Sequence, residues 1–184
     1  MHHHTVKTPA TAELEEKGSR FIGHLVPWAS FDTTLATLRQ KHRKASHHVT
    51  AFRHMLPENR IEESGKDDGE PAGTSGMPTL KVLIGANIVD AGIIIVRYFG
   101  GTKLGTGGLA RAYSATALRT IEAATLVPWH RIISRTIACA FEDMSAIEQR
   151  ISVVGLIVTA RDFSETGLNI TVEGPEALVT ALAE

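Results

Sequence analysis

The sequence has little cysteine and no long uninterrupted apolar segment. Cys139 is the only cysteine among the 184 residues, which excludes an internal disulfide and a cysteine-based metal cluster within one chain. It lies in an apolar segment, which favours a place in the core over a role as a nucleophile. No apolar segment approaches about 18 residues without a polar interruption, and there is no secretory signal. We therefore expect a cytoplasmic protein without a membrane partner.

Net charge is also small. At −1 it excludes a global electrostatic attraction to nucleic acid or acidic membranes, so any such binding must come from a local patch. The apolar content of 43% is sufficient for a packed core, and 184 residues allow one large domain or two small ones. The histidines at the start, His2 to His4, fit a tag remnant as well as a native segment, and we leave them out of metal arguments.

Acidic residues are absent between Asp90 and Glu122, and this part of the chain is the most informative. Residues 91–99 are apolar and rich in β-branched side chains, which predicts a buried strand. Five glycines follow between positions 100 and 108, and the Ala-rich segment 109–124 predicts a helix. The expected unit is therefore a strand, a glycine loop and a helix.

Two explanations of the glycine loop remain open. Glycines either supply positive φ angles and close packing, or leave backbone N–H groups free to face an anion at the start of the helix. A helix N-terminus already carries partial positive charge, so nearby cations are unfavourable unless an anion is present. That anion is either a ligand phosphate or one of the chain's own carboxylates. The candidate nucleic-acid or anion site comprises Arg97, Gly100, Gly101, Lys103, Gly105, Gly107, Gly108 and Arg111.

A second candidate region is the acidic loop within the long polar segment 55–77. Its carboxylates fit three roles: a solvated surface, a Mg²⁺ site, or internal partners for Lys103 or Arg97. A histidine pair precedes the loop on an expected strand, where adjacent side chains point to opposite faces and cannot easily share one ion. We expect one of them to be inward and hydrogen-bonded and the other on the surface. The possible functional loop comprises His47, His48, Asp67, Asp68, Gly69 and Glu70.

No catalytic arrangement is recognisable. A dinucleotide-type pattern, Gly105-x-Gly107-x-x-Ala110, lacks the acidic residue about 20 positions later that such folds require. We predict no catalytic residue, no metal and no cofactor.

The rest of the chain predicts alternating strands and helices. We expect a flexible arm over 1–18, strands over 19–27 and 47–53, a helix capped by Ser30 and a short helix over 77–84. After residue 131 the order is strand, helix, strand, strand, helix, which is part of a ferredoxin-like pattern without its last strand. The expected domains are 19–127 and 131–184, and the fold class is α+β.

Three ordered motifs resemble the IMPACT family, bacterial YigZ type. They are the histidine pair 47–48, the segment Asp68-Gly69-Glu70-Pro71-x-Gly73-Thr74-x-Gly76-x-Pro78, and the segment 96–113 from Val96-Arg97-Tyr98-Phe99-Gly100-Gly101 to Arg111-Ala112-Tyr113. The resemblance implies a first domain similar to domain 2 of ribosomal protein S5 and a ferredoxin-like second domain. It also implies a role in translation, because the eukaryotic relatives are translation regulators.

We therefore expect a non-enzymatic binding module in translation or its regulation, which contacts RNA or the ribosome through the basic glycine loop. One alternative is a small enzyme that binds a nucleotide or phosphorylated ligand at this loop. The other is a pure protein-interaction module. The sequence leaves the oligomeric state open.

Overall fold

The computed structural model describes residues 3–182 and divides into two compact units, Met1–Trp129 and His130–Glu184. Both units combine helices with antiparallel strands, so the predicted α+β class with two domains is confirmed. The likeness to ribosomal protein S5 and the ferredoxin-like pattern stay predictions. None of the helices within the described residues is long and apolar enough to cross a membrane.

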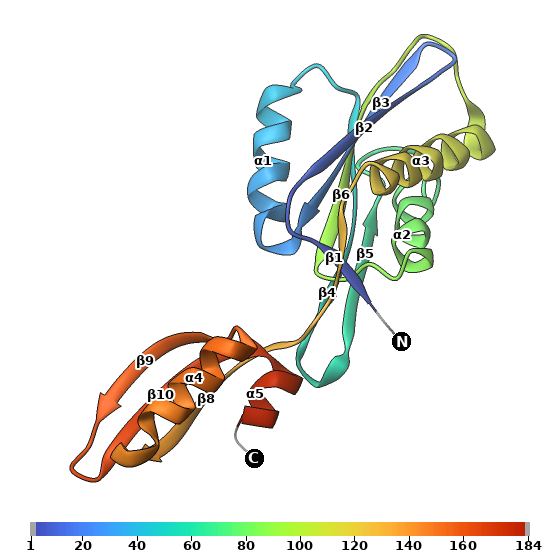
Figure 1. The fold of residues 1–184 in the computed structure, drawn as a ribbon. Coiled ribbons are helices and arrows are strands. Elements are labelled where there is room, and N and C mark those ends of the chain that lie inside the picture. The colour runs from blue at the N-terminus through green and yellow to red at the C-terminus, as the bar shows by residue number, and fades with distance from the viewer. Residues whose placement is uncertain (1–2, 183–184) are drawn as a thin grey trace. The chain divides into compact units, whose positions relative to one another are not determined.

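A five-stranded antiparallel sheet forms the centre of the first unit, in the order β2-β3-β6-β4-β5. Helix α1 covers one face of this sheet, and helices α2 and α3 cover the other (Figure 1). A separate pair joins β1 and β7 in antiparallel register. The strands of this unit are β1 (His4–Val6), β2 (Ala10–Glu16), β3 (Ser19–Pro27), β4 (His47–Met55), β5 (Ile61–Lys66), β6 (Ala91–Tyr98) and β7 (Leu126–Pro128). The helices are α1 (Phe31–Lys41), α2 (Gly76–Gly85) and α3 (Gly105–Glu122).

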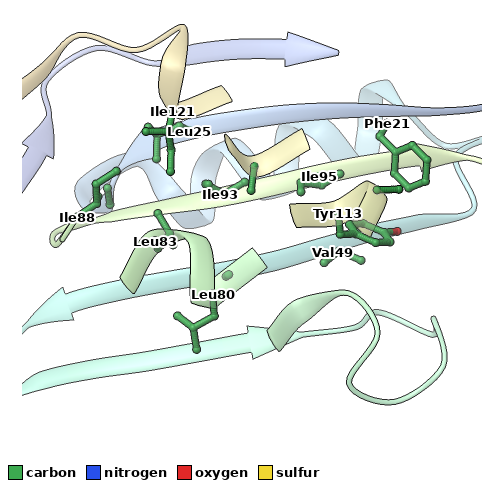
Figure 2. Close-up of a cluster of buried hydrophobic side chains, with 14 of the residues drawn as sticks. Phe21, Leu25, Val49, Leu80, Leu83, Ile88, Ile93, Ile95, Tyr113 and Ile121 are labelled. Carbon is green, nitrogen blue, oxygen red and sulfur yellow. The ribbon is translucent and has the colours of Figure 1, made fainter. Parts of the chain in front are cut away.

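Strand β6 is buried on both faces, which explains its continuous apolar sequence. Ile93 and Ile95 pack toward α2 and α3, whereas Ile94 and Val96 pack toward α1, since successive side chains of a strand alternate. Figure 2 shows the larger of these two clusters, with Phe21 and Tyr113 near one end of it. The strand thus places the residues that follow it at a fixed end of the sheet.

Three expectations about local structure were wrong. The part of the expected flexible arm that the structure describes contains β1 and β2, and β2 pairs along its length with β3; residues 1 and 2 lie outside the described residues. The polar segment 55–77 contains β5, which forms a hairpin with β4. Helix α3 begins at Gly105, so three of the five glycines belong to its first turn.

The second unit is a three-stranded antiparallel sheet in the order β8-β10-β9, packed against two helices. The element order agrees with the predicted strand, helix, strand, strand, helix. The described residues contain no fourth strand in this sheet. Its elements are β8 (Ile132–Ala140), α4 (Met144–Val154), β9 (Ile157–Phe163), β10 (Gly167–Pro175) and α5 (Glu176–Leu182).

Candidate functional site

A buried ion pair lies at the end of β6. Arg97 Nη1 lies 2.5 Å from Glu70 Oε1, and the two side chains are 6% and 3% exposed. The acidic loop therefore supplies an internal carboxylate to the basic segment, one of the roles left open by the sequence. Because this carboxylate neutralises the Arg97 guanidinium, Arg97 is not a candidate cation for binding a ligand phosphate.

Two further polar groups complete this pair. The Tyr113 hydroxyl donates to the same Glu70 oxygen at 2.7 Å, and burial, followed by this hydrogen bond, raises the pKa of Tyr113. On the other side, Arg97 Nη2 donates to Ser19 Oγ at 3.4 Å. The Arg97 guanidinium also lies 5.6 Å from the centre of the Phe99 ring, within cation–π range. The ion pair thus connects β3, β6, α3 and the acidic loop.

Asp67 organises the turn that leads into α2. Its carboxylate accepts hydrogen bonds from the Ser75 hydroxyl and from the backbone N–H groups of Gly73, Ser75 and Gly76. Burial by itself would raise the pKa of Asp67, but these hydrogen bonds together lower it below its usual value. The carboxylate is therefore occupied as an internal cap.

Asp68 fixes the same loop to β4. Its carboxylate accepts from the His48 backbone N–H at 2.7 Å and from Arg39 at 3.2 Å, and its carbonyl oxygen accepts from His47 Nδ1 at 2.8 Å. His47 is inward toward the ion pair, with Nε2 3.7 Å from Glu70 Oε2. His48 points to the opposite face, as expected of neighbours on a strand, and it is buried, whereas His47 is half-buried. Neither histidine is thus fully on the surface, contrary to the expectation for one of them.

A cavity of about 310 Å³ opens above the ion pair, between the acidic loop and the start of α3. Phe99, Leu104 and Leu109 supply apolar surface, and Lys103 supplies a cation. Phe99 is 50% exposed, which is unusual for a large aromatic side chain in this unit. On the other side of Leu104, a second cavity of about 240 Å³ is lined by Arg111, Lys17 and Glu16.

Neither exposed cation beside the start of α3 has a carboxylate partner in the described part of the chain: Lys103 and Arg111 form no ion pair there. The first turn of α3 contains no acidic residue, and no side chain caps it. Its positive end therefore faces solvent beside these two cations.

The glycines of the loop divide into different roles. Gly101 and Gly105 have φ angles of +88° and +72°, which side chains other than glycine rarely adopt. Gly100 lies against the backbone of Gly18 and Ser19 in the β2–β3 turn. Gly107 and Gly108 lie inside α3 without positive φ, so neither glycine is required for a left-handed turn. Gly69, φ +89°, shapes the acidic loop beside His47.

Three residues of the site were missed from the sequence. Tyr113 and Ser19 each lie far along the chain from Glu70, and their hydrogen bonds depend on the tertiary fold. Phe99 was assigned to the apolar end of the preceding strand. The sequence did contain a signal for an exposed Phe99, because two glycines follow it directly. A strand that ends at Tyr98, as β6 does, leaves the next aromatic residue outside the sheet.

We expect the first unit to lose stability as the pH falls from about 7 to about 5. Burial lowers the pKa of His24 and of His48 below the ordinary value of 6.5. The unfolded chain then binds more protons than the folded one below that value, so stability is lost as the pH falls through this range. Urea unfolding at pH 7.5 and pH 5.5 measures the effect.

The double variant His24→Gln/His48→Gln should reduce this pH dependence, because neither position can then take up a proton. The exposed His130→Gln variant is the control and should retain the wild-type pH dependence. An unchanged slope in the double variant would show that other groups cause the acid sensitivity.

The geometry defines a two-unit α+β protein whose first unit carries the ion pair and the α3 cavity. Residues 17–121 match the family described as the Impact N-terminal domain. This range includes every candidate residue of the site. The chain belongs to the IMPACT family, and the recognition made from the sequence is confirmed.

Two curated relatives and one solved structure are similar to the chain. The IMPACT family member YigZ of Escherichia coli (strain K12) is 34% identical over 143 residues, which cover 76% of this chain and 70% of the relative. An IMPACT family member of Haemophilus influenzae is 39% identical over 122 residues, covering 63% of this chain and 59% of the relative. A crystal structure of a hypothetical protein has a TM-score of 0.74 at 28% identity and covers 98% of this chain and 89% of that one.

Proposed function

We propose that the chain is a non-enzymatic RNA-binding module that acts in translation or its regulation. The contact surface consists of Phe99, Lys103, Arg111 and the first turn of α3. We call this surface the α3 site. The translational part of the proposal depends on membership of the IMPACT family, whereas the RNA part is argued from the geometry.

The observation that carries the proposal is an exposed aromatic ring beside unpaired cations at an uncapped helix start. Proteins that bind single-stranded nucleic acid combine a basic surface for phosphates with aromatic rings on which bases stack. Phe99 offers such a ring, and Lys103 lines the same cavity. The free N–H groups at the start of α3 favour a phosphate at this position.

The alternative of a Mg²⁺-dependent nucleotide enzyme has less support. Its carboxylates would be Asp67, Asp68 and Glu70, and each of them already accepts hydrogen bonds within the protein. A metal would have to displace donors that hold the loop and the ion pair in place. No observation favours a purely protein-binding surface over an RNA-binding one.

We expect the double variant Lys103→Gln/Arg111→Gln to bind single-stranded RNA more weakly than the wild type. Each lost phosphate contact should flatten the log–log salt dependence of binding by about 0.7, hence by about 1.4 for two contacts. The loss should be similar for all sequences, because phosphate contacts do not distinguish bases. Fluorescence anisotropy with labelled 12-nucleotide RNAs of different sequence, from 25 to 200 mM salt, measures both quantities.

Phe99→Ala provides an independent test at the same site. Loss of a stacked base costs about 1–3 kcal/mol, so affinity should fall by about 5-fold to 150-fold without a change in the salt slope. Lys81→Gln, an exposed cation on α2, is the control. Melting temperatures should stay close to the wild-type value for Lys103→Gln/Arg111→Gln, since both side chains are exposed. Absence of RNA binding by the wild type, or wild-type binding by the double variant, would refute the proposal.

A further inference from the structure

A second group of cations lies at the same end of the sheet as the α3 site. Helix α1 ends at Lys41, and the segment that leads to β4 carries Arg43 and Lys44. All three side chains are exposed, and none forms an ion pair with a carboxylate within residues 3–182. In Figure 1 the α1–β4 connection, the β2–β3 turn and the β6–α3 connection all lie toward the upper end of the sheet.

Hydrogen bonds fix the α1–β4 connection to the residues that precede the α3 site. The Ser46 backbone N–H donates to the Arg97 carbonyl oxygen at 2.8 Å, and the Phe99 backbone N–H donates to Ser46 Oγ at 3.2 Å. His42 Nδ1 and the Tyr98 hydroxyl are 2.8 Å apart. These hydrogen bonds therefore tie the connection that carries Arg43 and Lys44 to the end of β6 and to the Phe99 backbone.

Interaction with the negative end of helix α1 explains only some of these cations. Basic residues in the last turn complement the negative end of the helix, and Lys41 fits that role. Arg39 does not contribute to an open patch, because it pairs with Asp68. Arg43 and Lys44 follow the helix end in a turn, and neither has a carboxylate partner within residues 3–182.

Carboxylates near this end of the sheet do not cancel the patch. Glu70 is buried and neutralised by Arg97, and Asp67 and Asp68 are occupied by hydrogen bonds within their loop. Glu15 is exposed opposite Arg20 in the β2–β3 register, and Glu16 lines the cavity on the far side of Leu104 together with Arg111 and Lys17. The positive charge at this end thus exceeds the exposed negative charge.

We propose that Lys41, Arg43 and Lys44 continue the α3 site, so that one RNA single strand crosses the end of the sheet from α1 to α3. This inference depends on the proposed function and specifies the path and the strandedness of the RNA. The exposed Phe99 ring lines the α3 cavity with Lys103, and the Phe99 backbone is hydrogen-bonded to Ser46 of the α1–β4 connection. Stacking on this ring requires an unpaired base. A duplex keeps its bases stacked on one another and cannot use this ring.

The test compares two triple variants that each remove three exposed positive charges. In Lys41→Gln/Arg43→Gln/Lys44→Gln, the loss of three phosphate contacts should flatten the salt dependence by about 2 and reduce affinity for a 12-nucleotide single-stranded RNA by about 10-fold to 100-fold in low salt. The control, Lys7→Gln/Arg60→Gln/Lys81→Gln, changes the net charge equally at exposed positions outside the patch. It should stay within about twofold of the wild type. A blunt duplex of the same sequence should bind the wild type more weakly than the single strand.

The outcomes separate this inference from the proposed function. If Lys103→Gln/Arg111→Gln weakens binding but the α1 triple variant does not, the path over α1 is wrong and the α3 site stands. Equal losses in the two triple variants would show an effect of net charge only and would also refute the path. Tighter binding of the duplex than of the single strand would refute the inference that the bound RNA is single-stranded. If the wild type binds no RNA, both proposals fail.

Discussion

Glu70→Ala should destabilise the first unit by about 3–5 kcal/mol, because it leaves a buried cation without its partner. Arg97 is 6% exposed, so its charge is largely out of contact with water when Glu70 is removed. The variant also removes the acceptor of the Tyr113 hydroxyl. Urea unfolding followed by circular dichroism gives the free energy of unfolding for the wild type and the variant.

Glu62→Ala is the matched control, since Glu62 is an exposed carboxylate on β5. Its effect should stay within about 0.5 kcal/mol. The triple variant Glu70→Leu/Arg97→Met/Tyr113→Phe removes both charges and the Tyr113 hydroxyl at once, while Ser19 Oγ still accepts from the Gly100 N–H. It should recover most of the lost stability, because no buried charge is then left unpaired. A Glu70→Ala variant as stable as the control would mean that Arg97 finds solvent or another acceptor.

The Glu70→Ala variant should also affect the α3 site. Arg97 packs against the Phe99 ring, and Glu70 holds Arg97 in that position. Loss of the carboxylate should therefore disorder the aromatic ring as well as weaken the core. The ion pair explains why an acidic loop and a basic segment, far apart in the sequence, belong to one structure.

Sequence patterns predicted the buried elements well. The β-branched segment 91–99 and the helix expected after Ser30 were correct in type, and the predicted strand differs from β6 by one residue at its end. Strand β2 was missed because its outward positions carry glutamates. The alternation of Ala10, Ala12 and Leu14 with polar residues was present, and charged side chains are typical of edge strands.

The candidate site was predicted only in part, and the reason is electrostatic. The sequence indicated that Arg97, Lys103 and Arg111 needed an anion. It could not show which of these cations pairs with a carboxylate of the chain. Only the tertiary fold brings Glu70 to Arg97 and leaves the other two cations exposed. The turn at Lys17 and Gly18, where both residues have positive φ, likewise becomes important only through its contact with Gly100.

Gly100→Ala should destabilise the first unit by about 1–3 kcal/mol through a backbone collision. A Cβ atom at this position would lie 1.9 Å from the carbonyl carbon of Gly18 and 2.3 Å from the Ser19 nitrogen. Neither atom can move aside as a side chain would, so the β2–β3 turn or the β6–α3 connection must shift. The shift would also strain the hydrogen bond from the Gly100 N–H to Ser19 Oγ, which is 3.1 Å long.

Gly107→Ala is the matched control, because the same added methyl group meets only the flexible end of Arg111 at 3.3 Å. Within α3 alanine is a better helix former than glycine, so this variant should be as stable as the wild type or more stable by up to about 1 kcal/mol. Thermal and urea unfolding of both variants measures their stability, and RNA affinity is measured in parallel. Together they show whether residue 100 must be glycine because of its contact with Gly18 or because a ligand approaches its backbone. A Gly100→Ala variant that keeps full stability but loses RNA binding would show that this glycine admits a ligand to the backbone, and that its contact with Gly18 is dispensable.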